Sequence, residues 1–554
     1  MSILKKAIQF HNNNNLEEAE IIYKKIINQD KKNFNAFCLL GTLQVQKKNY
    51  DEGIVNLKKS LEIYDKNFIA INNLGLAYFN LENFNLAEKY FLRSIEINQS
   101  YFESYNNLGN IFLKKKNYLN ALRYYKKCLS IKNDFKIALL NIAKLLIEIK
   151  KYKLSEKILN KIKTIDPQNA ELYFLRGIIE KRNFKNDSAL ENLLNSINLK
   201  PDYCEAYNEI GFLYYLKKNF DKAEYYLKEA IKIDENFYGA KFNIGWLELL
   251  KENFKDGWKN YRYRKKINNS AKILIKIPEL DNLSNLKEKK LFIYSEQGLG
   301  DIIQFYRYIL LLSKKAKKVF FQVPYSLKYI LYSNESSIEL VDNFNKLSVC
   351  DFQCSLLDLP QIFETDIDNI PHNIPYISID ENLKRTWLTK LNKEKFKIGI
   401  CWQTGKKVDV DHLQFAQERS FDLKEFEKIA LLNNVELISL QKNSENFKND
   451  KICKNVKFFE NMDHLKPFMD SAAIIENCNL IISCDTSIVH LSAALGKETI
   501  LILNYNNDWR WGLNRDKSIW YNNVKILRQV EPGSWKEPFD KAYEIIINKI
   551  DEKN

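Results

Sequence analysis

A small residue recurs every 34 positions through the first half of the chain, and this period constrains the fold more than any other feature. The series consists of Ala7, Gly41, Gly75, Gly109, Ala143, Gly177, Gly211 and Gly245. A second small residue follows each member twelve positions later, from Ala19 to Gly257. A fixed period of this length indicates a repeat protein in which each copy is a helical hairpin. The two small positions of each copy mark where one helix presses against the other.

Large residues follow the second small series by four positions, or one helical turn. They are Tyr23, Leu57, Phe91, Tyr125, Leu159, Leu193, Leu227 and Tyr261. We expect them to fill the space between hairpins. The whole pattern resembles the tetratricopeptide repeat, with eight copies over residues 1–266. The resemblance implies an all-α, right-handed superhelix whose concave surface, lined by the first helices, docks a peptide or a protein.

Asparagine occupies the position two residues before several of the phased small residues. These are Asn73, Asn107, Asn141 and Asn243. An amide side chain both donates and accepts hydrogen bonds, so such a ladder can hold a peptide backbone whatever its sequence. A similar ladder occurs in the repeats of O-linked N-acetylglucosamine transferases, where it grips extended polypeptide. In a chain this rich in Asn, the alternative is a row of solvated polar residues.

After Arg264 the period is lost, and residues 267–289 form a polar connector. Short apolar segments then alternate with helical patterns, which predicts parallel sheets with helices on both faces. The alternation restarts after a break near residues 382–395, so we expect two lobes, 290–392 and 393–554. Ligands of such sheets bind beyond the carboxyl ends of the strands. The expected strands are 291–295, 317–323, 396–402, 435–440, 456–459, 480–483 and 499–503.

The first candidate motif, Ser295–Asp301, lies between an expected strand and a helix. Gly298 and Gly300 let the backbone approach a ligand closely, and the helix start offers N–H groups to an anion. Asp301 either caps the helix or acts as a general base, and spacing alone favours the cap. A dinucleotide fingerprint is absent, because Ile303 stands where its third Gly is required.

The second candidate motif, Cys484–His490, ends a strand and opens a helix. The hydroxyls of Thr486 and Ser487, together with the helix dipole, suit a diphosphate. His490 lies one turn further and could reach the same phosphate. The alternative is a capped helix with a buried His. A third motif, Asp409–Asp411, has a metal-binding DxD form but is better explained as a solvated loop.

Taken together, these motifs resemble glycosyltransferase family 9, the lipopolysaccharide heptosyltransferases, which have the GT-B fold of two Rossmann-like lobes. The similarity spans about residues 290–554 and is greatest to the bacterial branch whose catalytic region follows tetratricopeptide repeats. It rests on Glu296–Asp301, Cys401–Gln403, Arg419–Ser420, Cys484–His490 and Asp508–Trp511, which appear in this order. The resemblance implies that the first lobe faces the acceptor and the second the nucleotide sugar.

The resemblance also implies residue roles. Asp301 matches the catalytic base, with Glu296 as a possible helper. The implied nucleotide-sugar site comprises Gly298, Gly300, Trp402, Gln403, Arg419, Asp485, Thr486, Ser487, His490 and Arg510. Whether Lys406, Arg419 or Arg510 faces the diphosphate stays open, as do the sugar and the nucleotide base. No cofactor or metal is expected, since helix N–H groups and a basic side chain take the metal's place.

The implied reaction is a single inverting displacement that moves a sugar from a nucleotide diphosphate to a protein or glycan acceptor recruited by the repeats. Two alternatives remain. The chain is a repeat scaffold with a degenerate, non-catalytic transferase region, or it is a protein O-glycosyltransferase analogous to the O-linked N-acetylglucosamine transferases, whose catalytic motifs it does not match.

Composition excludes other classes. The net charge of +15 comes from Lys and Arg spread over the whole chain, without a basic stripe interleaved with aromatics, so nucleic acid is not an expected partner. Nine Cys without a CxxC pair indicate a reducing compartment. The first 15 residues lack the apolar core of a signal peptide, and no apolar stretch reaches the 18 or so residues of a membrane span. We therefore expect a cytoplasmic protein.

Overall fold

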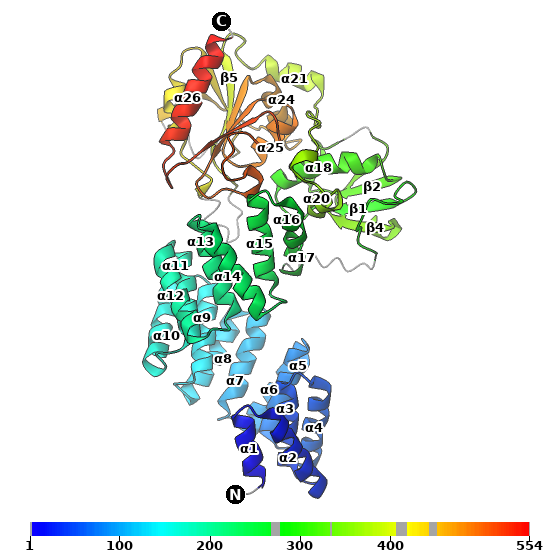
Figure 1. The fold of residues 1–554 in the computed structure, drawn as a ribbon, viewed down its shortest axis with the longest axis vertical. Coiled ribbons are helices and arrows are strands. Elements are labelled where there is room, and N and C mark those ends of the chain that lie inside the picture. Colours follow the sequence, from blue (N-terminus) through cyan, green and yellow to red (C-terminus); the bar gives the residue numbers. More distant parts are fainter. Residues whose placement is uncertain (1–2, 268–276, 333–334, 406–417, 443–450, 553–554) are drawn as a thin grey trace. The chain divides into compact units, whose positions relative to one another are not determined.

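The computed structural model describes residues 3–267, 277–332, 335–405, 418–442 and 451–552 (Figure 1). The chain forms two compact units, Met1–Asp202 and Tyr203–Asn554. The division lies within the helical repeats, whereas the sequence suggested a boundary at residue 266. The last hairpins therefore belong to the same compact unit as the α/β region, because their buried side chains pack into it.

The first unit consists of antiparallel helical hairpins in which each helix packs against the next. Its described helices are α1 (Ile3–Asn12), α2 (Leu16–Gln29), α3 (Phe34–Gln46), α4 (Tyr50–Ile63), α5 (Phe68–Asn80), α6 (Phe84–Ile97), α7 (Phe102–Lys114), α8 (Tyr118–Ile131), α9 (Lys136–Glu148), α10 (Tyr152–Ile165), α11 (Ala170–Arg182) and α12 (Asn186–Leu199). The second unit begins with α13 (Cys204–Leu216), α14 (Phe220–Ile233), α15 (Tyr238–Leu250), α16 (Phe254–Tyr261) and α17 (Arg264–Ile267). The predicted all-helical character of the first 260 residues is confirmed.

The phased glycines lie where the two helices of a hairpin touch. A Cβ atom on Gly75 would lie 2.6 Å from the ring of Phe91, and one on Gly211 would lie 2.7 Å from Leu227. Real Cβ contacts are not this short, so a Cβ at either glycine would force the neighbouring side chain to shift. The large residues of the second helix therefore cover the glycine of their own hairpin, in addition to any packing between hairpins.

Gly245 provides a direct test of this close packing. A Cβ there would lie 2.7 Å from the carbonyl carbon of Asn260 and closer still to the backbone nitrogen of Tyr261. Because backbone cannot rotate aside, we expect Gly245→Ala to lower the free energy of unfolding by about 2 kcal/mol. Gly239 lies in the same helix with its nearest Cβ neighbour at 3.6 Å. Gly239→Ala should thus raise stability by about 0.5 kcal/mol. Equal urea midpoints for the two variants would contradict the packing argument.

The first sheet of the second unit has four parallel strands in the order β3-β2-β1-β4. They are β1 (Lys290–Tyr294), β2 (Lys318–Gln322), β3 (Ile338–Val341) and β4 (Phe352–Ser355), with α18 (Leu299–Ser313), α19 (Tyr325–Lys328) and α20 (Leu359–Ile362) among the connecting helices. The chain moves from β1 to β2 and β3 on one side and returns to place β4 on the other. The topological switch point, where such sheets bind ligands, therefore lies between β1 and β4.

The second sheet has six parallel strands in the order β10-β9-β8-β5-β6-β7. The strands are β5 (Phe396–Cys401), β6 (Val435–Ser439), β7 (Val456–Lys457), β8 (Leu480–Ser483), β9 (Thr499–Leu503) and β10 (Val524–Arg528), and the helices include α21 (Glu381–Leu388), α23 (Glu427–Ala430), α24 (Met469–Asn477), α25 (Ser487–Ala494) and α26 (Lys536–Asp551). Its switch point lies between β5 and β8. The predicted α/β character with parallel sheets is confirmed.

Helix α21 belongs structurally with the second sheet rather than the first. It packs against α24, and the Trp387 Nε1 donates to Asp470 Oδ1 at 2.9 Å. The chain thus reaches the second lobe before residue 393, where the sequence suggested the boundary. The amphipathic pattern of α21 indicates a helix, but the sheet that it covers is decided by tertiary packing.

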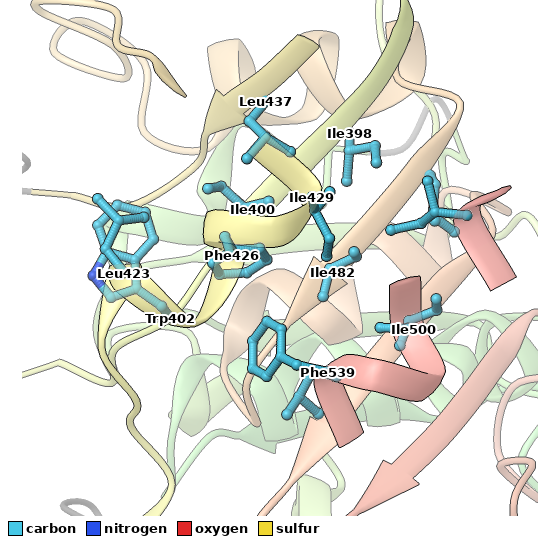
Figure 2. Close-up of a cluster of buried hydrophobic side chains, with 14 of the residues drawn as sticks. Ile398, Ile400, Trp402, Leu423, Phe426, Ile429, Leu437, Ile482, Ile500 and Phe539 are labelled. Atoms are coloured by element: carbon cyan, nitrogen blue, oxygen red, sulfur yellow. The ribbon is translucent and has the colours of Figure 1, made fainter. Parts of the chain in front are cut away.

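The second lobe is built on an apolar core between its sheet and its helices (Figure 2). Ile398, Ile400 and Ile482 project from the strands, and Phe426 and Phe539 cover them from helices. Edge-to-face contact between the two Phe rings, 5.0 Å apart, closes the layer. This core fixes the carboxyl ends of β5 and β8, where the second motif begins.

In the described parts of the chain, every helix is too short or too polar to span a lipid bilayer. The eight cysteines in these parts are free thiols.

Candidate functional site

The second motif opens helix α25 at the switch point of the second sheet. Thr486 is the N-cap residue, and its Oγ1 accepts a hydrogen bond from the Ile488 N–H at 3.3 Å. The Ser483 hydroxyl lies 3.2 Å from the same oxygen and fixes it. Ser487 begins the helix and is partly exposed. The helix start therefore presents N–H groups and the positive end of its dipole beyond the sheet edge.

Arg419 brings a positive charge to this helix start. Its Nη1 lies 3.5 Å from Asp485 Oδ2, directly before the cap residue. Burial alone would lower the pKa of Arg419, but the Asp485 carboxylate more than compensates and raises it. The guanidinium is thus held charged. Of the three basic residues left open by the sequence, Lys406 lies outside the described residues, as do Asp409 and Asp411.

Asp301, the candidate base, has two functions in the structure. It is the third residue of α18, and its Oδ2 accepts from the Gly298 N–H at 2.8 Å, as a helix cap does. Its Oδ1 pairs with the Arg510 Nη2. Burial raises the pKa of Asp301 above its usual value, although Arg510 opposes this. The structure thus shows the helix cap and a second carboxylate oxygen turned toward the second lobe, while the general-base role stays a prediction.

Arg510 comes from the second lobe, in the 3₁₀ turn η9 (Trp509–Trp511). Its Nη1 donates to Asp508 Oδ1 at 2.8 Å, and its guanidinium stacks 4.4 Å from the centre of the Trp509 ring. Desolvation would lower the pKa of Arg510, but Asp301 and Asp508 raise it well above its usual value. Arg510 is therefore a permanently charged link between the two lobes.

His490 lies beside the start of α18. Helices α18 and α25 pack together, and a Cβ on Gly300 would lie 2.7 Å from His490 Cδ2. The Nδ1 of His490 is 3.0 Å from the Tyr521 hydroxyl, and its ring stacks on Trp511 with centres 5.4 Å apart. Burial lowers the pKa of His490 to about 3. The imidazole is therefore neutral, and any contact with a phosphate uses a hydrogen bond rather than a charge.

The neutral, buried state of His490 predicts a pH dependence of stability. Below the unfolded-state pKa of 6.5, the unfolded chain binds a proton that the folded protein excludes, so stability falls with pH until about pH 3. This amounts to about 2 kcal/mol between pH 6.5 and pH 5. We expect His490→Gln to remove this part of the slope in urea titrations, whereas His464→Gln, at an exposed His, should leave it unchanged. Parallel slopes for wild type and His490→Gln would contradict the assignment.

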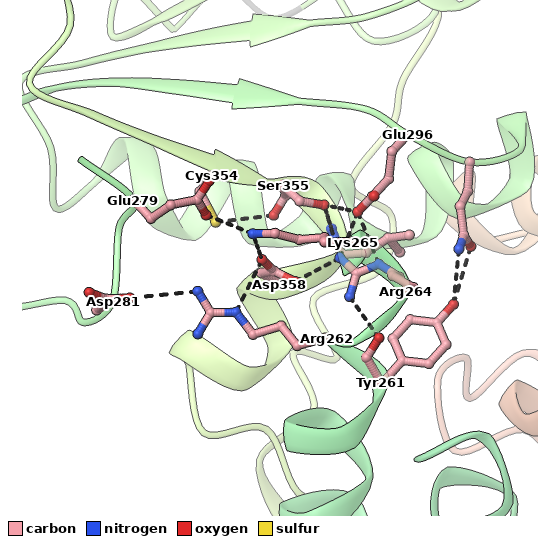
Figure 3. Close-up of polar contacts among 12 residues, drawn as sticks. Tyr261, Arg262, Arg264, Lys265, Glu279, Asp281, Glu296, Cys354, Ser355 and Asp358 are labelled. Carbon is pink, nitrogen blue, oxygen red and sulfur yellow. Dashed lines mark hydrogen bonds and ion pairs between the residues drawn. The ribbon is translucent and has the colours of Figure 1, made fainter. Parts of the chain in front are cut away.

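Glu296 is engaged by residues other than Asp301. Its Oε1 accepts from Arg264 Nη2 at 2.6 Å and from the Ser355 hydroxyl (Figure 3). The same Arg264 Nη2 donates to Asp358 Oδ1 at 2.6 Å. An arginine of α17 thus binds the Glu296 carboxylate, and a role of Glu296 beside Asp301 stays a prediction. This network also fills the switch point of the first sheet, between the ends of β1 and β4.

Trp402 does not present its ring to a ligand. It is fully buried in the core of the second lobe, beside Leu423 (Figure 2). The backbone after β5 is instead held by Gln441, whose Oε1 accepts from the N–H groups of Trp402 at 3.3 Å and Gln403 at 3.0 Å. The burial of the Trp402 ring leaves the Gln403 side chain, which is partly exposed, as the group of this segment that can reach a ligand. That the segment lies near the donor phosphates stays a prediction. Gln441 carries no sequence signal for this role.

The predicted ladder of asparagines forms hydrogen bonds inside the protein. Each amide donates to a residue in the first helix of the preceding hairpin, usually to an Asn 35 positions earlier. The pairs are Asn73 with Thr42 (2.6 Å), Asn107 with Asn72 (3.0 Å), Asn141 with Asn106 (3.0 Å) and Asn243 with Asn208 (2.8 Å). The ladder is thus neither fully solvated nor wholly free for a peptide, and the Asn-Asn dipeptides at 72–73 and 106–107 were the signal for this.

Models of the tetratricopeptide repeat match residues 34–67, 67–134, 112–177 and 204–237. These segments are tetratricopeptide repeats. No curated protein matches the chain.

Solved structures resemble the chain at low sequence identity. The APC/C heterotetramer Cut9–Hcn1 is 14% identical over 49% of this chain and 54% of its own, with a TM-score of 0.41. A tetratricopeptide repeat protein from Parabacteroides merdae is 21% identical over 43% of this chain and 94% of its own (TM-score 0.37). YrrB, described as having an unusual peptide-binding site, is 21% identical over 33% and 95% (TM-score 0.26). The chain thus spans about half the length of the first of these.

Tetratricopeptide repeats typically bind proteins or peptides. Sequence reasoning gave no role to Trp258, Arg264 or Tyr521. Arg264 pairs with Glu296, Tyr521 contacts His490, and Trp258 contacts Trp509, the neighbour of Arg510. For Trp258 the sequence signal was the density of aromatic residues, since the ring centres of Trp258, Trp509 and Trp520 lie within 6.3 Å of one another.

Proposed function

We propose that residues 290–554 are a metal-independent, inverting glycosyltransferase of the GT-B type. It moves a sugar from a nucleotide-diphosphate donor to a protein or glycan acceptor recruited by the repeats. The observation that carries this proposal is the meeting of the starts of α18 and α25, with Asp301 of one lobe paired to Arg510 of the other. A carboxylate opposite a cationic helix start is the arrangement that proton removal and diphosphate departure require.

In the proposed reaction, the diphosphate lies at the start of α25, where the hydroxyls of Thr486 and Ser487, helix N–H groups and Arg419 receive it. Asp301 removes the proton from an acceptor hydroxyl. That oxygen attacks the anomeric carbon, and the bond from this carbon to the diphosphate oxygen breaks with its electron pair leaving on the nucleotide diphosphate. Arg510 stabilises the departing charge.

The ion pair between Asp301 and Arg510 allows Arg510 to change partner from the carboxylate to the bound diphosphate. A bound diphosphate competes with the carboxylate for the guanidinium, since both are anions that pair with Arg. As Arg510 turns toward phosphate, Asp301 loses the charge that opposes its burial, and its pKa rises further. Donor binding therefore makes Asp301 a stronger base at the moment when the acceptor arrives.

A second candidate is a non-catalytic scaffold with a degenerate transferase region. The observation that favours it is that both oxygens of Asp301 are engaged, one by the Gly298 N–H and the other by Arg510. In a scaffold, this carboxylate would serve only to join the two lobes.

The test is calorimetry of the full-length chain with a panel of nucleotide-diphosphate sugars, followed by a nucleotide-release assay with and without a metal chelator. The proposal predicts binding and turnover that the chelator does not alter. Arg419→Met should weaken donor binding about tenfold, and Arg385→Met, at an exposed arginine of α21, should not. Binding without turnover would favour the scaffold. The lack of any nucleotide binding would overturn the proposed transferase function.

A further inference from the structure

The last repeat contacts both lobes through one buried residue. Trp258 of α16 is 3% exposed, and its Nε1 donates to the Thr365 carbonyl of the first lobe at 2.9 Å. The centre of its ring lies 5.3 Å from the ring centre of Trp509 and 6.3 Å from that of Trp520, in edge-to-face geometry. Both of these residues belong to the second lobe. Aromatic contacts of this kind have a preferred geometry and resist sliding.

The contact continues from Trp258 to the charged pair. Trp509 lies between Trp258 on one side and the Arg510 guanidinium on the other, the latter 4.4 Å from its ring centre. Arg510 then pairs with Asp301. Trp258, Trp509 and Arg510 are buried and Asp301 is partly buried, and each step in this series is a direct contact.

A second contact from the same helix supports the other end of the pair. Tyr261 lies 5.9 Å from the Trp509 ring, and its hydroxyl is 3.2 Å from Gln297 Nε2. Gln297 stands four residues before Asp301 in the same loop. Helix α16 thus touches the turn that carries Arg510 and also the loop that carries Asp301.

From this arrangement we propose that Trp258 is a positioning residue, which holds Arg510 in register with Asp301, and that the last repeat is therefore part of the catalytic unit. The catalytic consequence rests on the proposed function. Small displacements at a reacting centre are costly, and a misplacement of about 1 Å can cost about 100-fold in rate. A repeat that only recruited the acceptor would not be expected to affect turnover of the donor.

The experiment compares full-length variants by hydrogen–deuterium exchange and by steady-state kinetics. Trp258→Leu removes the aromatic ring, while Trp258→Phe keeps a smaller aromatic ring and loses the hydrogen bond to Thr365. Trp387→Leu is the matched control, because Trp387 is a buried indole of α21 that donates to Asp470 and contacts Phe459. Trp258→Met is the second variant to be used if Trp258→Leu does not fold.

We expect Trp258→Leu to increase exchange in peptides covering residues 509–511 and 298–305, and to lower kcat at least 30-fold with the donor KM changed less than threefold. Trp258→Phe should keep the wild-type exchange in these peptides and the wild-type kcat. Trp387→Leu should leave exchange at residues 509–511 and 298–305 unchanged. Trp258→Leu combined with Trp509→Leu should be no worse than Trp509→Leu alone, since both act on Arg510.

Two results would overturn the proposal. One is unchanged exchange at both segments in a folded Trp258→Leu or Trp258→Met protein, and the other is strictly additive losses in the double variant. If the wild-type chain turns over no donor, the proposed function fails, but the exchange data still decide whether Trp258 positions the pair.

Discussion

Replacing Asp301 by Asn is expected to reduce sugar transfer by about 1,000-fold without weakening nucleotide-diphosphate binding, because the neutral amide no longer competes with the diphosphate for Arg510. The amide keeps the size of the side chain and can still accept from the Gly298 N–H, so the start of α18 is preserved. It cannot accept the proton of the acceptor hydroxyl, and loss of a general base costs about 100- to 10,000-fold. Nucleotide-release kinetics and calorimetry on the same preparation measure the two quantities.

The control for this prediction is Asp380→Asn. Asp380 also caps a helix, since its Oδ1 accepts from the Asn382 and Leu383 N–H groups at the start of α21, but it pairs with no residue of the site. This variant should transfer sugar at the wild-type rate. Full activity in Asp301→Asn would exclude the base role and leave Asp301 as a helix cap and lobe link.

Arg264→Met is expected to lower the free energy of unfolding of the second unit by about 3–5 kcal/mol, because it removes the buried cation that Glu296 and Asp358 share. Asp358, whose side chain is fully buried, pairs with Arg264 at 2.6 Å and Lys265 at 2.8 Å (Figure 3). Burial alone would raise the pKa of Asp358, but Arg264 and Lys265 more than offset this and lower it. The ionised Asp358 therefore contributes its full stabilisation of the folded protein at pH values above 3.8, the ordinary pKa of Asp. This contribution is lost as the pH falls below that value.

The loss in Arg264→Met should accordingly shrink in acid, which urea titrations at pH 7 and pH 3 can measure. Arg515→Met is the matched control. Arg515 pairs with Glu252 at 2.5 Å, but its side chain is 44% exposed, and surface pairs of this kind contribute less than about 1 kcal/mol. Equal midpoints for the two variants at pH 7 would show that the buried network does not stabilise the unit.

The elements that the sequence predicted well are those whose pattern is local. The 34-residue period marks each hairpin because every copy needs the same close helix contact, as at Gly75 and Phe91. Central strands such as β5 and β8 are buried on both faces and are therefore continuous apolar runs. The strands that sequence analysis missed are β3, β4 and β10, which lie at the edges of their sheets. An edge strand such as Ile338–Val341 is only half buried, so its residues carry little hydrophobic signal.

The candidate site also has features that local sequence predicted and contacts that it did not. Its two motifs were recognisable because a strand end followed by a helix start has a local signature in Thr486, Ser487 and the glycines before Asp301. The resemblance gave Glu296 as a possible helper of the base, whereas its partner in the structure, Arg264, is 32 positions away in the last helices of the repeats. Arg510, which pairs with Asp301, is 209 positions away.

By itself, the sequence determined the helical repeats, the parallel α/β region and the places where helices begin beside strand ends, because backbone geometry and hydrophobic period act over a few residues. Only the tertiary structure decided which charges meet, namely Arg510 with Asp301 and Arg264 with Glu296 and Asp358. It also decided that the last repeat contacts both lobes. A buried charge must find a partner wherever the chain brings one, and sequence distance does not restrict that choice.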